Sequence, residues 1–185
     1  LARLLKRKYP HLHITLGGPI FSVNSKQLMG HPEFFQEFCD SIVTFEGEEL
    51  LHRLLTALRN GSTLKDVPNL LFHEDGKIES NEERVELRFE EMPPPTFDGL
   101  PMDLYLSPYP ILPVLQSRGC YWGKCTFCTH SFIYGHRYGK QRTEQMVDEL
   151  ENLARKYKTK YFTFSDEAVS PHSLNDVSEE IIKRN

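Results

Sequence analysis

The sequence lacks the long apolar run and the excess of positive charge that would point to a membrane or to a nucleic acid. No stretch of about 18 consecutive apolar residues occurs among its 185 residues, so no transmembrane helix is expected. The net charge of −4 argues against a protein held mainly by nucleic-acid phosphates. Internal repeats and low-complexity tracts are absent as well. We therefore expect a globular protein with neither a membrane nor a nucleic acid as its partner.

Cysteine is scarce too, and its distribution is uneven. Only four cysteines occur, and three of them, Cys120, Cys125 and Cys128, fall within nine residues. Secreted proteins stabilised by disulfides usually space their cysteines more widely, so the expected location is the reducing cytoplasm. The fourth, Cys39, follows Phe38 on an apolar helical stripe and is expected in the core.

The first third of the sequence alternates short apolar strands with helical patterns. His13–Leu16 and residues 41–45 are predicted to be buried strands, whereas residues 32–39 and 47–61 carry apolar residues at helical spacing. Gly61 stands where a glycine cap would end the second helix. This order of strands and helices predicts an open α/β sheet with parallel strands.

The pattern changes over residues 62–110, which we expect to connect two parts of the protein. Residues 69–80 hold two short extended runs around Asp75-Gly76, which predicts a hairpin. Residues 82–110 are acidic and then rich in proline, which is typical of a linker.

A second α/β unit is expected over residues 111–185. Residues 111–117 are a candidate strand that leads into the clustered cysteines, residues 143–157 form a helical pattern, and residues 160–167 form the next strand. The sequence starts with Leu, and both of its ends fall within helical patterns. We therefore expect it to be a piece of a longer protein.

The clustered cysteines have the spacing C-x4-C-x2-C, and thiolates at such short spacing suit iron–sulfur clusters or zinc. Three thiolates on a 4Fe-4S cluster would leave one iron with an open position for a substrate or a cofactor. A structural zinc site with His130 as the fourth ligand is an alternative, as are free thiols. That alternative corresponds to a non-catalytic zinc-binding or redox-regulatory module.

The stretch SRGCYWGKCTFC, between a predicted strand and a predicted helix, resembles the cluster loop of the radical S-adenosylmethionine enzymes. Its first gap of four residues departs from the usual C-x3-C-x2-C of that family. The resemblance implies that Cys120, Cys125 and Cys128 bind three irons of a 4Fe-4S cluster, and that the fourth iron chelates S-adenosylmethionine. One electron, from a donor such as flavodoxin or ferredoxin, would then cleave the sulfonium and give a 5′-deoxyadenosyl radical.

The same resemblance implies a complete or partial (β/α) barrel with the cluster loop after its first strand. Phe127, just before the last cysteine, is then expected near the adenine. Ser165, Asp166 and Glu167, at the end of the second strand, are expected to hold the methionine amino group of S-adenosylmethionine, since barrel enzymes place their chemistry at this end of the strands. Beyond the cluster ligands, no catalytic residue is implied.

A second resemblance involves the stretches LKRKYPHLHITLGGP and CDSIVTFEGEELLHRLL. They are similar to the last two strand–helix units of the Rossmann-like cobalamin-binding domain that precedes many of these enzymes. The resemblance implies that Gly17, Gly18 and Pro19 lie near the nucleotide tail of cobalamin. The Asp-x-His-x-x-Gly motif of some cobalamin proteins is absent, so a simple turn is the alternative.

The resemblances predict an α/β protein made of three parts. Residues 1–61 would end a Rossmann-like, cobalamin-binding-type domain, residues 62–110 would link, and residues 111–185 would hold the first two β/α units of a radical S-adenosylmethionine barrel. The implied activity is 4Fe-4S-dependent reductive cleavage of S-adenosylmethionine to drive radical chemistry on a small molecule or a peptide, with cobalamin as an optional cofactor. Two strands cannot close a barrel, so this piece alone is expected to be inactive and to self-associate through exposed apolar surface.

Overall fold

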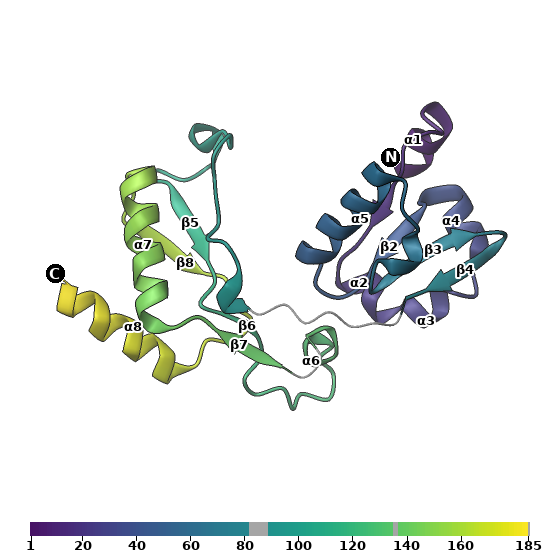
Figure 1. Cartoon of the computed structure of the whole chain (residues 1–185). Helices are drawn as coiled ribbons and strands as arrows, with labels where there is room; N and C mark the ends of the chain where they lie inside the picture. The colour runs from purple at the N-terminus through teal and green to yellow at the C-terminus, as the bar shows by residue number, and fades with distance from the viewer. Residues whose placement is uncertain (82–88, 135–136, 185) are drawn as a thin grey trace. The chain divides into compact units, whose positions relative to one another are not determined.

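The computed structural model describes residues 1–81, 89–134 and 137–184, and the chain divides into two compact units (Figure 1). The first unit is Leu1–Leu87 and the second is Arg88–Asn185. Across the described ranges, every helix is too short or too polar to cross a membrane. Residues 82–88 of the segment expected to be a linker lie outside the described residues.

A four-stranded sheet in the order β1-β2-β3-β4 organises the first unit. Strand β1 (Thr15–Leu16) is parallel to β2 (Ser41–Val43), which confirms the expected parallel pair. Strands β3 (Leu70–Glu74) and β4 (Lys77–Ser80) form the predicted hairpin. This hairpin does not stand apart in a linker, because β3 pairs antiparallel with β2 and its first three residues are buried.

Short helices flank this sheet. They are α1 (Ala2–Lys8), α2 (Pro19–Val23), α3 (Ser25–Leu28), α4 (Pro32–Phe38), α5 (Glu48–Asn60) and a 3-10 turn at Leu64–Asp66. Helix α5 buries Leu50, Leu54 and Ala57, and it ends at Gly61 with φ of 64°, the left-handed cap expected from the sequence. Cys39 is fully buried beside Phe35, which confirms its expected place in the core.

The second unit contains two small sheets. Strands β5 (Ile111–Val114) and β8 (Tyr161–Phe164) are parallel neighbours, and β6 (Ser117–Gly119) pairs antiparallel with β7 (Tyr138–Lys140). The helices are α6 (His130–Ile133), α7 (Thr143–Tyr157) and α8 (Pro171–Arg184), with 3-10 turns at Phe89–Glu91 and Met102–Leu104. Helix α7 lies between β5 and its parallel neighbour β8 in the chain, so the order strand–helix–strand predicted from the sequence is present, with β6, α6 and β7 inserted after β5.

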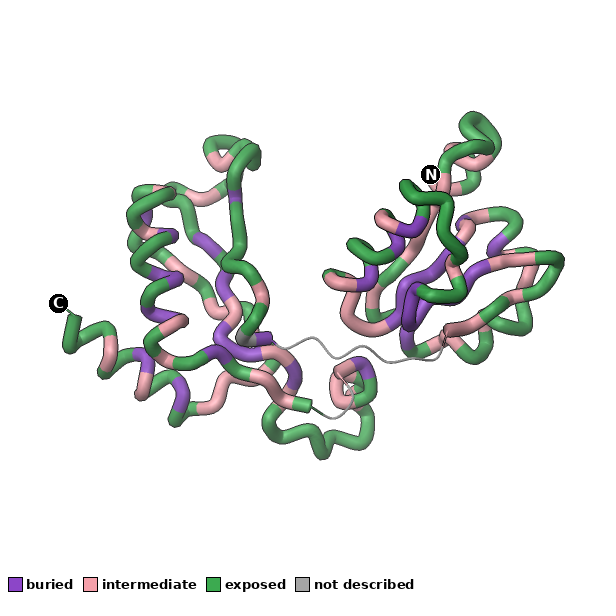
Figure 2. Tube along the Cα trace, viewed as in Figure 1, coloured by how far each residue is buried: buried purple, intermediate pink, exposed green. Residues whose placement is uncertain are grey.

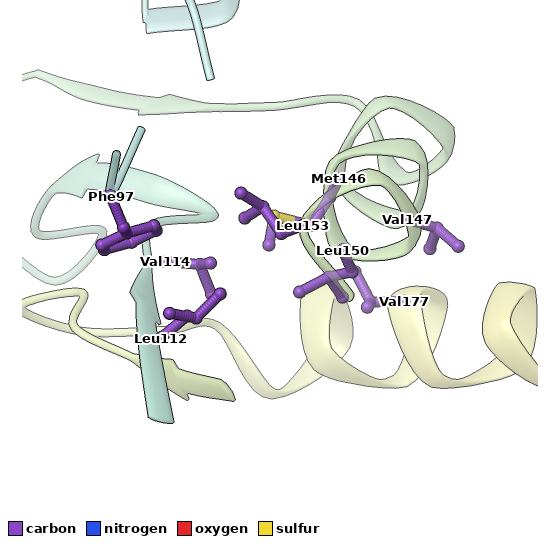
Figure 3. Close-up of a cluster of buried hydrophobic side chains, with 8 residues drawn as sticks. All are labelled: Phe97, Leu112, Val114, Met146, Val147, Leu150, Leu153 and Val177. Carbon is purple, nitrogen blue, oxygen red and sulfur yellow. The ribbon is translucent and has the colours of Figure 1, made fainter. Parts of the chain in front are cut away.

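One apolar core holds the second unit together (Figure 3). Leu112 and Val114 of β5 belong to it, together with residues of α7 that share one face of that helix (Figure 2). Phe97, from the proline-rich segment, joins the same core, and its backbone amide donates to the hydroxyl of Tyr157 at 2.7 Å. The end of the segment expected to be a linker is therefore part of this unit. The protein as a whole is a mixed α/β structure.

Candidate functional site

The three clustered cysteines lie in the loop that leads from β6 to α6 (Figure 1). Cys120 follows β6 directly and forms an isolated parallel bridge with Ala168. The backbone amide of Cys128 donates to the carbonyl of Cys125 at 3.3 Å, which turns the chain just before α6. All three are free thiols; Cys125 is exposed and the other two are partly exposed. The loop therefore presents three reduced thiols at the surface of the second unit.

This donor set fits an iron–sulfur cluster chemically, because three free thiols in one loop are the ligands that iron–sulfur clusters take. The positions of these thiols, however, are not yet those of a formed metal site. Among the residues that the structure describes, no three His, Cys, Asp or Glu side chains are grouped closely enough to hold a metal ion. The same statement applies to the alternative zinc site that would add His130. The loop thus supplies ligands of the right type, which would have to close around a metal on binding.

Close packing of the backbone explains why a glycine, Gly119, precedes the first cysteine. Its φ is 87°, a left-handed value, and a Cβ atom there would collide with the carbonyl oxygen of Arg137. The close approach lets β6 pair with β7, as Gly119 lies opposite Tyr138. The backbone at Arg137 and Tyr138, which follows the loop and α6, is thereby brought next to Gly119, where the loop begins.

Exposed aromatic rings accompany the thiols. Phe127 is 88% exposed, and Tyr121 and Trp122 are exposed as well. The ammonium group of Lys124 lies 5.3 Å from the centre of the Trp122 ring. An uncovered ring beside Cys128 is available to stack on a planar base, and the place of Phe127 next to adenine stays a prediction.

Asp166 follows β8, and both oxygens of its carboxylate are engaged by donors of the protein. The backbone amide of Ser117 donates to Oδ1 at 2.6 Å, the backbone amide of Gln116 donates to Oδ2 at 3.2 Å, and the Ser117 hydroxyl also donates to Oδ1. Gln116 and Ser117 are buried. Asp166 therefore joins the end of β8 to the start of the cysteine loop, a contact for which the sequence carries no signal.

Glu167 makes the matching contact on the other side of the loop. The hydroxyl of Tyr134 donates to its Oε1 at 2.9 Å, and Nδ1 of His130 lies 3.9 Å from the same oxygen. The rings of His130 and Tyr134 stack with centres 6.2 Å apart. Glu167 thus faces α6, the helix that follows Cys128.

Ser165, the third residue predicted at this strand end, lines a cavity of about 350 Å³ in the second unit. Its backbone amide donates to the carbonyl of Val114 at 2.9 Å. The cavity walls are mostly apolar but include Glu149, whose pKa is raised by burial although Gln141 donates a hydrogen bond to it at 3.2 Å. This cavity was not anticipated from the sequence, because its walls come from several separate segments.

A second cavity, of about 440 Å³, lies at the carboxyl ends of β1 and β2 in the first unit. Gly17, Gly18, Phe45 and Glu48 are among its lining residues. Gly18 has φ of 103°, a value that side chains disfavour, and Pro19 occupies the first position of α2 instead. Open α/β sheets bind ligands at this edge, so two of the three residues predicted for cobalamin line a cavity in the expected place.

The chain is similar to two curated methyl-transferring proteins, although no model of a known protein family matches it. It is 31% identical over 172 residues to an uncharacterised methyltransferase of Pyrococcus horikoshii, covering 90% of this chain and 36% of the relative. It is 27% identical over 166 residues to the hopanoid C-3 methylase of Methylococcus capsulatus, covering 83% of this chain and 29% of that protein. The chain thus spans about a third of the length of these relatives.

Two solved structures are similar to this chain in fold. One is the radical S-adenosylmethionine methyltransferase TsrM from Kitasatospora setae, with tryptophan and an S-adenosylmethionine analogue bound. The similarity covers 93% of this chain and 33% of the TsrM chain, with a TM-score of 0.66 and 22% identity. Another is the cobalamin-dependent S-adenosylmethionine radical enzyme OxsB, with aqua-cobalamin and S-adenosylmethionine bound. The similarity covers 98% of this chain and 27% of the OxsB chain, with a TM-score of 0.69 and 23% identity.

These comparisons confirm the resemblance first suggested by the cysteine loop: the structural neighbours are cobalamin-dependent radical S-adenosylmethionine enzymes. The groups bound in the neighbours are those expected from the sequence. Another TsrM structure holds cobalamin and a 4Fe-4S cluster, and the OxsB structure holds cobalamin and S-adenosylmethionine. The mixed α/β fold of this chain is shared with them.

Proposed function

We propose that this chain is the part of a cobalamin-dependent radical S-adenosylmethionine methyltransferase in which the cobalamin-binding domain ends and the radical barrel begins. The observation that carries the proposal is the loop of three free thiols after β6, in a fold similar to that of TsrM and OxsB. Methyl transfer is favoured over other radical reactions because both curated relatives are methyl-transferring proteins.

In this proposal the two units are incomplete versions of two known domains. Strands β1 and β2 would be the last parallel strands of a Rossmann-like cobalamin-binding domain, and the cavity lined by Gly17 and Gly18 would take part of cobalamin. The parallel pair β5 and β8 would be the first two strands of the radical barrel. The cysteine loop comes after β5 in the chain, with the short strand β6 between them, and Ser165–Glu167 follow the carboxyl end of β8. Barrel enzymes bind their substrates at this end of the strands.

The residues of the chain would hold and orient the cofactors. Thiolates of Cys120, Cys125 and Cys128 would bind three irons, and the exposed ring of Phe127 would lie against the adenine. When bound, the cluster supplies the electron that cleaves S-adenosylmethionine, and cobalamin supplies a carrier for the methyl group. Ser165 and Glu167, which follow β8, would contact the methionine group of S-adenosylmethionine. A flavodoxin or ferredoxin would deliver the electron, and the substrate would be a small molecule or a peptide.

Iron and sulfide counting after anaerobic reconstitution of the 185-residue chain tests this proposal. We expect about four irons and four sulfides per chain. Cys120→Ala, Cys125→Ala and Cys128→Ala should each reduce the loading, whereas the matched control Cys39→Ala should not, because Cys39 is buried in the other unit. Stoichiometric zinc without iron uptake would overturn the proposal in favour of a zinc-binding or redox-regulatory module.

Self-association of the isolated chain is a further part of the proposal. Ile111 and Tyr161 lie side by side on the parallel pair β5 and β8, and they are 48% and 49% exposed. Apolar surface of this kind promotes association. Sedimentation should show oligomers that increase with concentration, and a monomer at all concentrations would contradict this part.

A further inference from the structure

Three consecutive residues after β8 contact both ends of the cysteine loop. They are Asp166, Glu167 and Ala168, and we call them the strand-end staple. Asp166 and Ala168 contact the segment where the loop begins, and Glu167 contacts the helix where the loop ends.

The contacts at the start of the loop are made by buried groups. The carboxylate of Asp166 accepts hydrogen bonds from the backbone amides of Gln116 and Ser117, and both of these residues are about 99% buried. One residue past β6, the backbone of Cys120 bridges to Ala168. The first cysteine is thus held at a fixed place beside the end of β8.

The contact at the end of the loop is made by the side chain of Glu167, which also lies 3.9 Å from Nδ1 of His130. The hydroxyl of Tyr134, the residue after α6, donates to Oε1 of Glu167 at 2.9 Å. The ring of Tyr134 is stacked on His130, which begins α6 two residues after Cys128. Fixing Tyr134 therefore fixes the helix that follows the last cysteine.

We propose that Glu167 and Tyr134 are positioning residues, which together with Asp166 hold the two ends of the cysteine loop at a set separation. A loop with fixed ends loses less conformational entropy when its interior becomes ordered around a ligand. The interior needs this help, because Cys125 and its aromatic neighbours are exposed. The staple would therefore favour closure of the three thiols around a cluster. This inference rests on the proposed function for the identity of the ligand, but the contacts of the staple do not depend on it.

Hydrogen exchange of the metal-free 185-residue chain tests the staple directly. Tyr134→Phe and Glu167→Ala each remove the same hydrogen bond, so amides between Cys120 and Tyr134 should exchange about fivefold faster in either variant, the population change expected for one net hydrogen bond. The double variant should exchange no faster than Glu167→Ala alone, because that change already removes the hydrogen bond from Tyr134. Tyr105→Phe and Glu179→Ala serve as matched controls at exposed positions and should change nothing in the loop.

Cluster assembly provides the second readout. The iron concentration that half-loads the chain should rise by the same factor of about five in Tyr134→Phe and Glu167→Ala. Glu167→Gln keeps an acceptor oxygen for Tyr134, so its iron loading should be close to that of the wild-type chain. If instead the negative charge of the carboxylate were what matters, Glu167→Gln would load iron as poorly as Glu167→Ala. Unchanged loop exchange in both single variants, or additive effects in the double variant, would overturn the staple. If the wild-type chain binds no iron, the proposed function fails, and the exchange experiment still decides the staple.

Discussion

The carboxylate of Asp166 accepts hydrogen bonds from both the backbone amide and the hydroxyl group of Ser117, which lies 49 residues earlier in the chain. One side chain thereby ties the end of β8 to the segment that opens the cysteine loop. The family resemblance suggested that Asp166 holds S-adenosylmethionine, but its oxygens are already bound by protein donors. Oε1 of Glu167 is engaged by the hydroxyl of Tyr134 as well, so a contact of these strand-end residues with S-adenosylmethionine stays a prediction.

Asp166→Asn should destabilise the second unit. The amide nitrogen of the new side chain cannot accept a hydrogen bond, so one buried donor of Gln116 or Ser117 would lose its partner. Such a loss typically costs about 1–3 kcal/mol in the free energy of unfolding. Urea denaturation measures it, with Asp103→Asn at an exposed position as the control. Equal unfolding free energies for the two variants would contradict the structural role of Asp166.

Gly119→Ala should destabilise the protein more than Gly99→Ala. Both glycines have left-handed backbones, with φ of 87° and 80°, so the backbone strain of the substitution is matched. Only at Gly119 would the added methyl group collide with the carbonyl oxygen of Arg137, whereas nothing lies within 4 Å at Gly99. The difference in unfolding free energy should be about 1–3 kcal/mol. If thermal denaturation finds the two variants alike, β6 and β7 do not approach as closely as described.

The four thiols should differ in reactivity with iodoacetamide. Burial raises the pKa of Cys39 to about 12, so this cysteine holds its proton in the folded chain and its reactive thiolate is scarce. Cys125 is exposed, and Cys120 and Cys128 are partly exposed. At about pH 8, mass spectrometry should detect alkylation of the three loop cysteines and protection of Cys39 until urea unfolds the chain. Alkylation of Cys39 in the folded chain at the rate of Cys125 would contradict its burial.

Glu149→Gln should stabilise the protein at neutral pH. Burial raises the pKa of Glu149, so the folded state favours its protonated form, and the stability it contributes is present below the unfolded pKa and lost as the pH rises through the folded one. A neutral glutamine avoids this loss. It can also donate to Oε1 of Gln141, a buried atom that has no hydrogen-bond partner in the described structure.

The stabilisation by Glu149→Gln at pH 7 should be roughly 1 kcal/mol, the scale for a buried polar group that gains a partner. Its pH dependence is the sharper test. The advantage should shrink as the pH falls through the raised pKa of folded Glu149, and it should be smallest below about 4, where the carboxyl is protonated in both states. Thermal denaturation at several pH values measures it, with Glu179→Gln at an exposed position on α8 as the control. An advantage that does not change with pH would show that burial of the carboxylate is not its cause.

Local patterns of the sequence were enough to predict much of the fold. The apolar periodicity of α5 and α7, the left-handed cap at Gly61 and the turn at Asp75-Gly76 each depend on residues close together in the chain. The parallel pairing of β1 with β2 followed from the alternation of strands and helices.

Other features could not be predicted because they depend on distant contacts. Phe97 stands in a segment that looks like a linker, and it becomes a core residue because distant residues pack on it, among them Tyr157, 60 positions later. The engagement of Asp166 by Ser117 and of Glu167 by Tyr134 likewise joins residues 49 and 33 positions apart. The chemical type of the site was thus readable from the three cysteines, whereas the residues that position it were not.

The most direct test of the account is the electron paramagnetic resonance spectrum of the reconstituted, reduced 185-residue chain, recorded before and after addition of S-adenosylmethionine. A cluster held by Cys120, Cys125 and Cys128 has one iron without a protein ligand, so the account predicts a reduced-cluster signal that changes when S-adenosylmethionine binds. A cluster signal that S-adenosylmethionine leaves unchanged would contradict the open iron site. The absence of any cluster signal, with zinc bound instead, would contradict the proposed radical chemistry altogether.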